Sequence, residues 1–166
     1  MSTGLVICAT RGGEASRSTQ EHAIALARER GAELVFLYVA DCGFAGLPKG
    51  ALLGALQDEL MNLGHSLLAL AQARAARAGL EAQVVVLCGP VRATIREYLL
   101  KAAASVLVLG ASGPPTRHRV FSPEEVLRFA ESLVVGTGVE VHIVTAEGTI
   151  LRPGSPSPIV PPETSG

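Results

Sequence analysis

A chain of 166 residues, 48% of them hydrophobic, has room for one domain whose core covers a sheet on both faces, and it excludes a second full domain. The formal net charge of -1 excludes a global attraction to nucleic acid or to an anionic membrane, so neither is expected as a partner. The apolar run at residues 5–9 is too short for a signal peptide and no run approaches the ~20 residues of a membrane span, which predicts a cytoplasmic protein.

Strand-like and helix-like segments alternate along the chain. Apolar runs rich in β-branched residues predict five strands, at residues 5–10, 33–39, 81–87, 105–109 and 139–145. The first intervening helix is predicted to follow Ser18, whose spacing to Glu21 fits a capping box, and to end near Gly31. The second helix carries a stripe of leucines that is interpreted as core or dimer contact, at positions 53, 56, 60, 63, 67 and 70.

The last two helices begin at clear start signals, and the pattern then stops. One helix starts at Gly89 and Pro90, and the other follows Ser122. Uniformly apolar strands alternating with helices predict a mostly parallel sheet with helices on both faces. Residues 147–166 hold five of the ten prolines without any helix or strand period, which predicts an extended or disordered tail after a packed domain at residues 1–146.

Cysteines and histidines form no pattern that indicates catalysis, a metal site or a disulfide framework. The cysteines lie far apart without a C-x-x-C pair, and Cys8 and Cys88 are expected to be buried as small hydrophobic residues. No G-x-S-x-G nucleophile elbow occurs, and no histidine has a Ser or Cys partner at a readable spacing. The sequence therefore predicts a protein that is not an enzyme.

Two glycine-bearing loops are candidates for ligand binding. TRGGEAS, residues 10–16, follows the first strand, and VLVLGASGPPTRHRVFSPEE, residues 106–125, runs from the fourth strand into the last helix. Ligands of open parallel sheets bind beyond the carboxyl ends of strands, where successive connections leave in opposite directions. Both loops would border such a crevice if strands one and four were neighbours, which periodicity alone does not prove.

Two longer segments resemble the universal stress protein family. VICATRGGEASRSTQEHAIALARERGAELVFLYVAD is similar to that family's opening, and GPVRATIREYLLKAAASVLVLGASG is similar to its third helix, fourth strand and glycine loop. Their order and spacing match over residues 5–145. The resemblance implies an open five-stranded parallel sheet in the order 3-2-1-4-5, of the adenine nucleotide alpha hydrolase-like kind, with a central crevice and commonly a homodimer.

Some members of the family bind ATP, and the resemblance implies where a nucleotide would lie. Arg11 stands where binders have an acidic residue for the nucleoside, and Val39 stands where the base meets backbone. In binders the phosphates lie on a loop with G-x-x-G, nine residues and then G-[ST]. Gly110 and Gly113 reproduce the first part, and Ser122 falls at the serine.

The departures from this pattern disfavour ATP. Arg11 removes a carboxylate acceptor and adds a cation, and Phe121 replaces the glycine before the serine. Only seven residues separate Phe121 from Gly113. A bulky side chain and a shorter loop both obstruct the approach of backbone to phosphate.

Each element of the loop pattern that this sequence retains also has a structural interpretation. Ser122 is explained as a helix cap without any ligand, and Gly110 as relief of strain in a turn. Arg11 fits an ion pair with Asp41 at the end of the adjacent strand, and a solvated loop tip accounts for Arg117, His118 and Arg119. Because no Asp or Glu occurs from residue 98 through 123, these arginines and Arg11 would still attract a small anion.

The sequence thus predicts a non-catalytic binding or signalling module of the universal stress type, acting in stress response, with a degenerate phosphate loop and no cofactor. Its expected partners are a second copy of the chain and a small anion or nucleotide. The homodimer is expected because the fifth strand, VEVHIVT, would be an exposed sheet edge. The alternative is an ATP-binding member with slow ATP hydrolysis or phosphotransfer.

Overall fold

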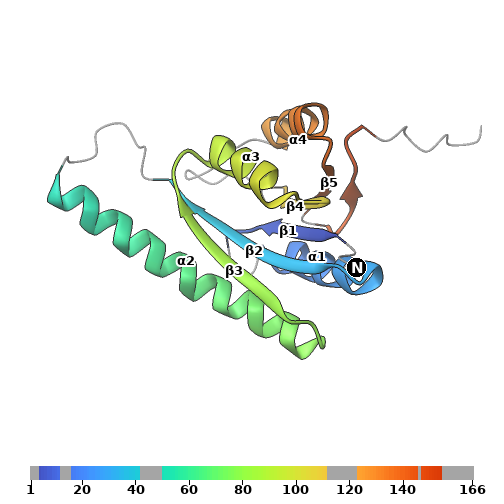
Figure 1. The fold of residues 1–166 in the computed structure, drawn as a ribbon, viewed down its shortest axis with the longest axis horizontal. Coiled ribbons are helices and arrows are strands. Elements are labelled where there is room, and N and C mark those ends of the chain that lie inside the picture. Colours follow the sequence, from blue (N-terminus) through green and yellow to red (C-terminus); the bar gives the residue numbers. More distant parts are fainter. Residues whose placement is uncertain (1–3, 12–15, 42–49, 112–122, 146, 155–166) are drawn as a thin grey trace, which may run out of the picture.

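The computed structural model describes residues 4–11, 16–41, 50–111, 123–145 and 147–154 (Figure 1). Strands and helices alternate through these ranges, as the sequence predicts. In chain order the elements are β1 (Leu5–Ala9), α1 (Arg17–Arg30), β2 (Glu33–Ala40), α2 (Ala51–Arg77), β3 (Ala82–Cys88), α3 (Val91–Ala102), β4 (Val106–Gly110), α4 (Pro123–Thr137), β5 (Glu140–Val144) and β6 (Ile150–Leu151).

The strands form one sheet whose order confirms the predicted topology and adds a strand to it. In the described residues the order is β3-β2-β1-β4-β5-β6. The first five strands are parallel, whereas β6 runs antiparallel to β5 through the pairs Ile143↔Leu151 and Val144↔Ile150. The two central strands, β1 and β4, are side by side, which periodicity alone did not establish.

The sheet continues past residue 146, where the sequence predicts the end of packed structure. A tight connection joins β5 to β6: the Thr145 amide donates to the Thr149 carbonyl at 2.9 Å, and Gly148 takes a left-handed φ of 83°. Ile150 then packs against the core. A strand of two residues is too short to produce an alternating pattern, so its sequence gave no signal. The carboxyl-terminal end of β5 is therefore paired with β6, and β5 is not an open sheet edge along its whole length.

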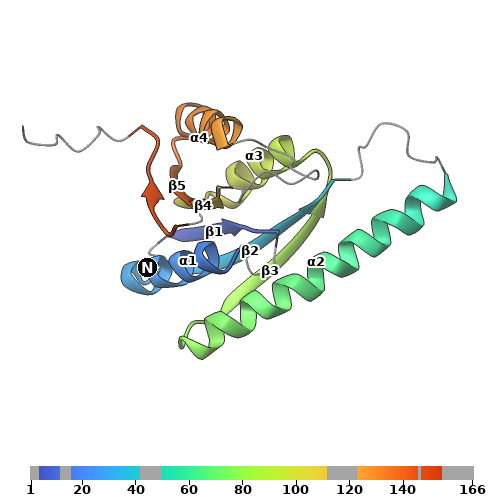
Figure 2. The same cartoon turned by 180° about the vertical axis from the view of Figure 1, so that it is seen from behind.

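Helices cover both faces of the sheet, α1 and α2 on one and α3 and α4 on the other (Figures 1 and 2). Along β2, Leu34 and Phe36 belong to the core under α1 and α2, and Val35 and Leu37 belong to the opposite core. Burial on both faces explains why the strands are uniformly apolar. The amino-terminal end of α2 runs beyond the sheet (Figure 2). None of the described helices is long and apolar enough to cross a membrane.

The first helix begins differently from the prediction and ends as predicted. Its N-cap is Ser16 rather than Ser18, and no side-chain hydrogen bond caps it. Glu21 does not complete a capping box, because its carboxylate accepts a hydrogen bond from Arg17 Nε at 2.9 Å, one turn earlier. The helix ends at Gly31, whose left-handed φ of 60° suits a residue without a side chain.

Candidate functional site

The carboxyl ends of β1 and β4 meet at the point where the chain leaves the sheet in opposite directions. The register pairs Ala9 with Leu109, so Thr10 and Gly110 extend the two strands to the same edge. The connection after β1 forms α1 on one face, and the connection after β4 leads to α4 on the other. This is the topological switch point at which open parallel sheets bind ligands.

Three of the predicted site residues lie at this edge. Arg11 is exposed just beyond β1, and Gly110 is the exposed last residue of β4. Val39 lies near the end of β2 and is half-buried. Because β2 pairs Leu37 with Ala9, the same register brings Val39 level with Arg11. The strand order that the family resemblance implies is therefore confirmed, and the roles of these three residues in binding a ligand stay predictions.

The other three predicted site residues, Gly113, Arg117 and Ser122, lie outside the described residues. Their proposed roles in holding phosphate or an anion stay predictions from the sequence.

Gly110 has a packing reason to be glycine. A Cβ atom built on Gly110 would lie 2.8 Å from Thr19 Oγ1 on α1. Thr19 is only 3% exposed, so its hydroxyl has little room to move away. The closeness of α1 to the end of β4 therefore requires a residue without a side chain, with or without a ligand.

A buried chain of hydrogen bonds connects this edge to α2. Gln20, 1% exposed, donates from Nε2 to Thr10 Oγ1 at 3.2 Å. Its Oε1 accepts from Arg74 Nη1 at 2.6 Å. Thr10 in turn donates its backbone amide to the Leu37 carbonyl at 3.0 Å. The nitrogen and the oxygen of the buried Gln20 side chain thus both have a hydrogen-bond partner, and these bonds connect α2 to the carboxyl end of β1.

A second polar chain lies under α1, on the side of β5. Glu140 accepts two hydrogen bonds from the Arg30 guanidinium, at 2.9 and 3.0 Å, and lies 2.6 Å from His142 Nε2. Since a carboxylate only accepts, His142 Nε2 carries the proton. On the other side of the ring, His142 Nδ1 lies 2.9 Å from His22 Nε2, and one of these two nitrogens donates a hydrogen bond to the other. His142 is fully buried, so this chain crosses the protein interior.

The pKa values in this second chain follow from those contacts. The hydrogen bond from Arg30, together with that from His142, lowers the pKa of Glu140 to about 2. Burial, and then the nearby His142, lowers the pKa of His22. These shifts favour an ionised Glu140 and a neutral His22 at neutral pH.

No local pattern in the sequence pointed to either chain of hydrogen bonds. His22 and His142 are 120 positions apart, and Gln20 and Arg74 are 54 apart. Such contacts follow only from the tertiary fold, which brings α1 onto β5 and α2 onto α1.

The cysteines differ from the prediction in one case. Cys8 is fully buried as expected, and burial raises the pKa of its thiol, which keeps it protonated and unreactive. Cys88 is exposed, because it ends β3, the outer strand on that side of the sheet. Within the described ranges, no three side chains of His, Cys, Asp or Glu are grouped so as to hold a metal ion.

A parallel sheet with a switch point between β1 and β4, covered by helices on both faces, defines the doubly wound class of α/β domain. The family model of the universal stress proteins matches residues 4–145, and the chain belongs to this family. Among curated proteins, none matches the sequence.

Solved structures of the same family share the fold. The chain is 21% identical to universal stress protein UspA from Lactobacillus plantarum, with a TM-score of 0.68 over 86% of this chain and 98% of that one. A universal stress protein from Archaeoglobus fulgidus in complex with dAMP is 18% identical, with a TM-score of 0.58 and coverage of 86% and 98%. An Arabidopsis thaliana family protein with AMP bound is 13% identical, with a TM-score of 0.57 and coverage of 86% and 91%.

Proposed function

We propose that this chain is a non-catalytic binding module of stress response that holds a small anion or a nucleoside phosphate at the edge where β1 and β4 end. The observation that carries the proposal is the position of Arg11 beside Gly110, at the switch point of the sheet. A guanidinium there attracts phosphate oxygens, and strand ends of this kind supply backbone amides to a ligand. The related structures solved with AMP and dAMP support a nucleoside phosphate as the ligand class.

The same arginine disfavours tight binding of ATP. The resemblance implies that ATP binders place a carboxylate at this position to accept hydrogen bonds from the nucleoside. Arg11 has only donors, so those hydrogen bonds cannot form. We therefore propose that charge attraction contributes more to binding than recognition of the nucleoside, and that ATP binds weakly.

The proposal of a non-catalytic role rests on where the reactive groups lie. His142 and Cys8 are both fully buried. Glu140, with its lowered pKa, is held by Arg30 and His142 at the amino-terminal end of β5, whereas the candidate site lies at the carboxyl ends of the strands. A general base needs hydrogen-bond reach of the reacting group, and these residues are engaged elsewhere.

Calorimetry with AMP and ATP tests the proposal. We expect Arg11→Ala to weaken binding of AMP, and we expect the double change Arg11→Asp with Phe121→Gly to raise the affinity for ATP above that of the parent. Phe121 lies outside the described residues, and its replacement follows from the family's loop pattern. Arg128→Gln, an exposed arginine on α4, is the charge-matched control. Tight binding of ATP by the parent, with release of phosphate from its magnesium complex, would instead support the ATP-hydrolysing alternative.

We also propose a homodimer, although only part of β5, and not the whole strand, is an open sheet edge. In the described residues β6 pairs only with Ile143 and Val144, so the amino-terminal part of β5 has no strand neighbour on that side. Such an edge is prone to pair with another chain. Sedimentation velocity should report twice the chain mass at micromolar concentration, and an unchanged monomer mass over a tenfold rise in concentration would refute the dimer.

A further inference from the structure

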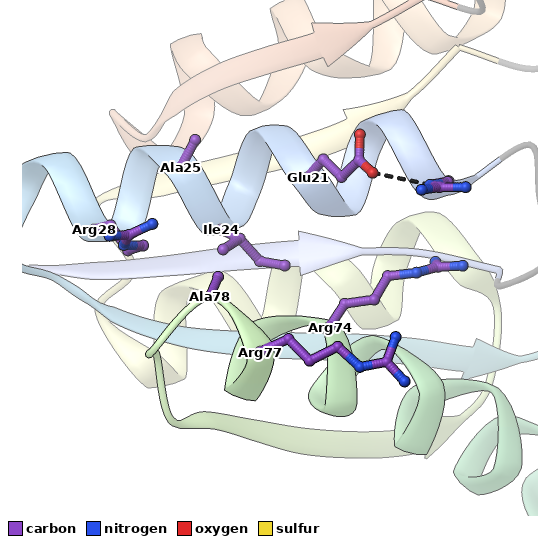
Figure 3. A pocket seen from close by; sticks show the side chains of 8 residues that line it. Glu21, Ile24, Ala25, Arg28, Arg74, Arg77 and Ala78 are labelled. Atoms are coloured by element: carbon purple, nitrogen blue, oxygen red, sulfur yellow. Dashed lines mark hydrogen bonds and ion pairs between the residues drawn. The ribbon is translucent and has the colours of Figure 1, made fainter.

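A groove between α1 and the carboxyl-terminal end of α2 has a strongly basic lining. It has a volume of about 390 Å³ and is lined by Arg17 and Arg28 from α1 and by Arg74 and Arg77 from α2 (Figure 3). Glu21 is the one acidic residue of the lining. The remaining residues are small or aliphatic, such as Ile24.

This concentration of charge does not reflect the chain as a whole. The protein has 14 basic and 15 acidic side chains, whereas four arginines and one glutamate line the groove. The pair of Arg17 with Glu21 is internally neutral, at 2.9 Å. Among the described residues, no ion pair or side-chain hydrogen bond engages Arg28 or Arg77, so their charge is available to a ligand.

The helix dipoles explain part of this arrangement. Arg28 lies in the last turn of α1, and Arg74 and Arg77 lie in the last turn of α2, where cations are favourable. A basic side chain in the last turn, however, interacts favourably with the dipole from any face of the helix. The dipoles therefore do not explain why the arginines of two helices line the same groove.

Arg74 is held in place from beneath the groove. Its Nη1 donates to the Oε1 of Gln20, which is 1% exposed, and Gln20 is itself fixed by Thr10. The guanidinium has further donors beyond the one that Gln20 occupies. A side chain already ordered in the free protein loses less conformational entropy when it binds a ligand.

We propose that this groove is a second anion site, which binds a chain of two or more phosphate groups and is separate from the edge where β1 and β4 end. Arginine guanidinium groups bind phosphate oxygens through paired hydrogen bonds. Arg17 and Arg28 are eleven residues apart on α1, which is about 16 Å along the helix and more than one phosphate spans. The lining has no pocket formed by large aromatic residues of the kind that anchors a protein partner, which favours an oligophosphate over an acidic peptide.

Calorimetry with phosphate, pyrophosphate and tripolyphosphate tests this site. We expect affinity to rise with the number of phosphates. The double change Arg28→Gln with Arg77→Gln should weaken tripolyphosphate binding at least tenfold, because each removes a charge-assisted contact. Arg128→Gln on the opposite face of the sheet is the matched control and should leave binding unchanged. Both groove arginines are exposed, so the double variant should unfold at the same urea concentration as the parent.

Four outcomes would overturn the proposal: equal affinity for the three probes, tripolyphosphate binding that the double variant retains, an equal loss in Arg128→Gln, or tighter binding of a glutamate-rich peptide of matched charge. Arg11→Ala separates this site from the one proposed above. It should weaken AMP binding and leave intact the tripolyphosphate binding that depends on Arg28 and Arg77. If instead Arg11→Ala alone abolishes tripolyphosphate binding, the anion lies at the strand ends and the groove is not a site.

Discussion

Replacing Gly110 by alanine tests whether this glycine serves packing. The added Cβ would lie 2.8 Å from Thr19 Oγ1, well inside van der Waals contact. Thr19 is buried and β-branched, so its side chain cannot rotate away freely. We expect Gly110→Ala to destabilise the protein even when no ligand is present.

The expected magnitude combines two opposing contributions. Inserting a methyl group into a packed region costs about 1–3 kcal/mol. Replacing glycine by alanine returns about 0.4–1 kcal/mol by restricting the unfolded chain. The midpoints of these two ranges give a net loss in the free energy of unfolding of about 1.3 kcal/mol. When Thr19→Ala removes the opposing hydroxyl, Gly110→Ala should become neutral or slightly stabilising.

Urea unfolding followed by circular dichroism measures this double-mutant cycle. Gly54→Ala is the control: a Cβ at Gly54, within α2, meets no atom within 4 Å, and the change should stabilise by about 1 kcal/mol through helix propensity. If Gly110→Ala is as stable as the parent, or equally destabilised in both Thr19 backgrounds, the packing explanation is wrong. Unchanged stability with lost binding of AMP would mean that the glycine serves a ligand.

Three further predictions concern stability. Glu140→Gln should lower the free energy of unfolding by about 1 kcal/mol at pH 7, a value discounted because the carboxylate is 39% exposed. Because the pKa of Glu140 is lowered from 4.5 to about 2, its contribution to stability is present above about pH 4.5, and the difference between variant and parent should disappear between about pH 5 and 2. A difference that stays constant over this pH range would contradict the prediction. Deleting residues 147–166 removes β6 and should cost about 1 kcal/mol in urea unfolding, whereas deleting 155–166 alone should cost less than about 0.5; equal losses would mean that β6 contributes nothing. Ala103→Gly should raise the melting temperature, because Ala103 has a φ of 53° at the end of α3 and glycine removes up to about 1 kcal/mol of strain; a lower melting temperature would refute the strain.

The sequence predicted the elements well because burial on both faces leaves a strong apolar signal. The strands near residues 5, 33, 81, 105 and 139 all appear, and Gly31 ends α1 as expected. Adjacency of β1 and β4 came only from the resemblance to a family, since nothing local distinguishes neighbouring strands from distant ones.

The errors share a physical cause, which is that tertiary contacts override local signals. Ser18 and Glu21 have capping-box spacing, but Glu21 binds Arg17 and the helix starts earlier. Cys88 follows an apolar run and is nevertheless exposed at the outer strand. The basic groove was missed because its arginines come from two helices whose packing no sequence period reveals.

The central position of β1 has a consequence for synthesis on the ribosome. Val6 of β1 pairs with Leu34 on one side and with Val106 on the other, so the second partner emerges about a hundred residues later. While β4 is still being translated, the nascent half-sheet of β1, β2 and β3 presents an apolar, unpaired border. Pairings of such long sequence separation form slowly, and a border of this kind is prone to join another chain. The order in which the strands are made therefore leaves the border of β1, in the middle of the finished sheet, open until β4 has been translated.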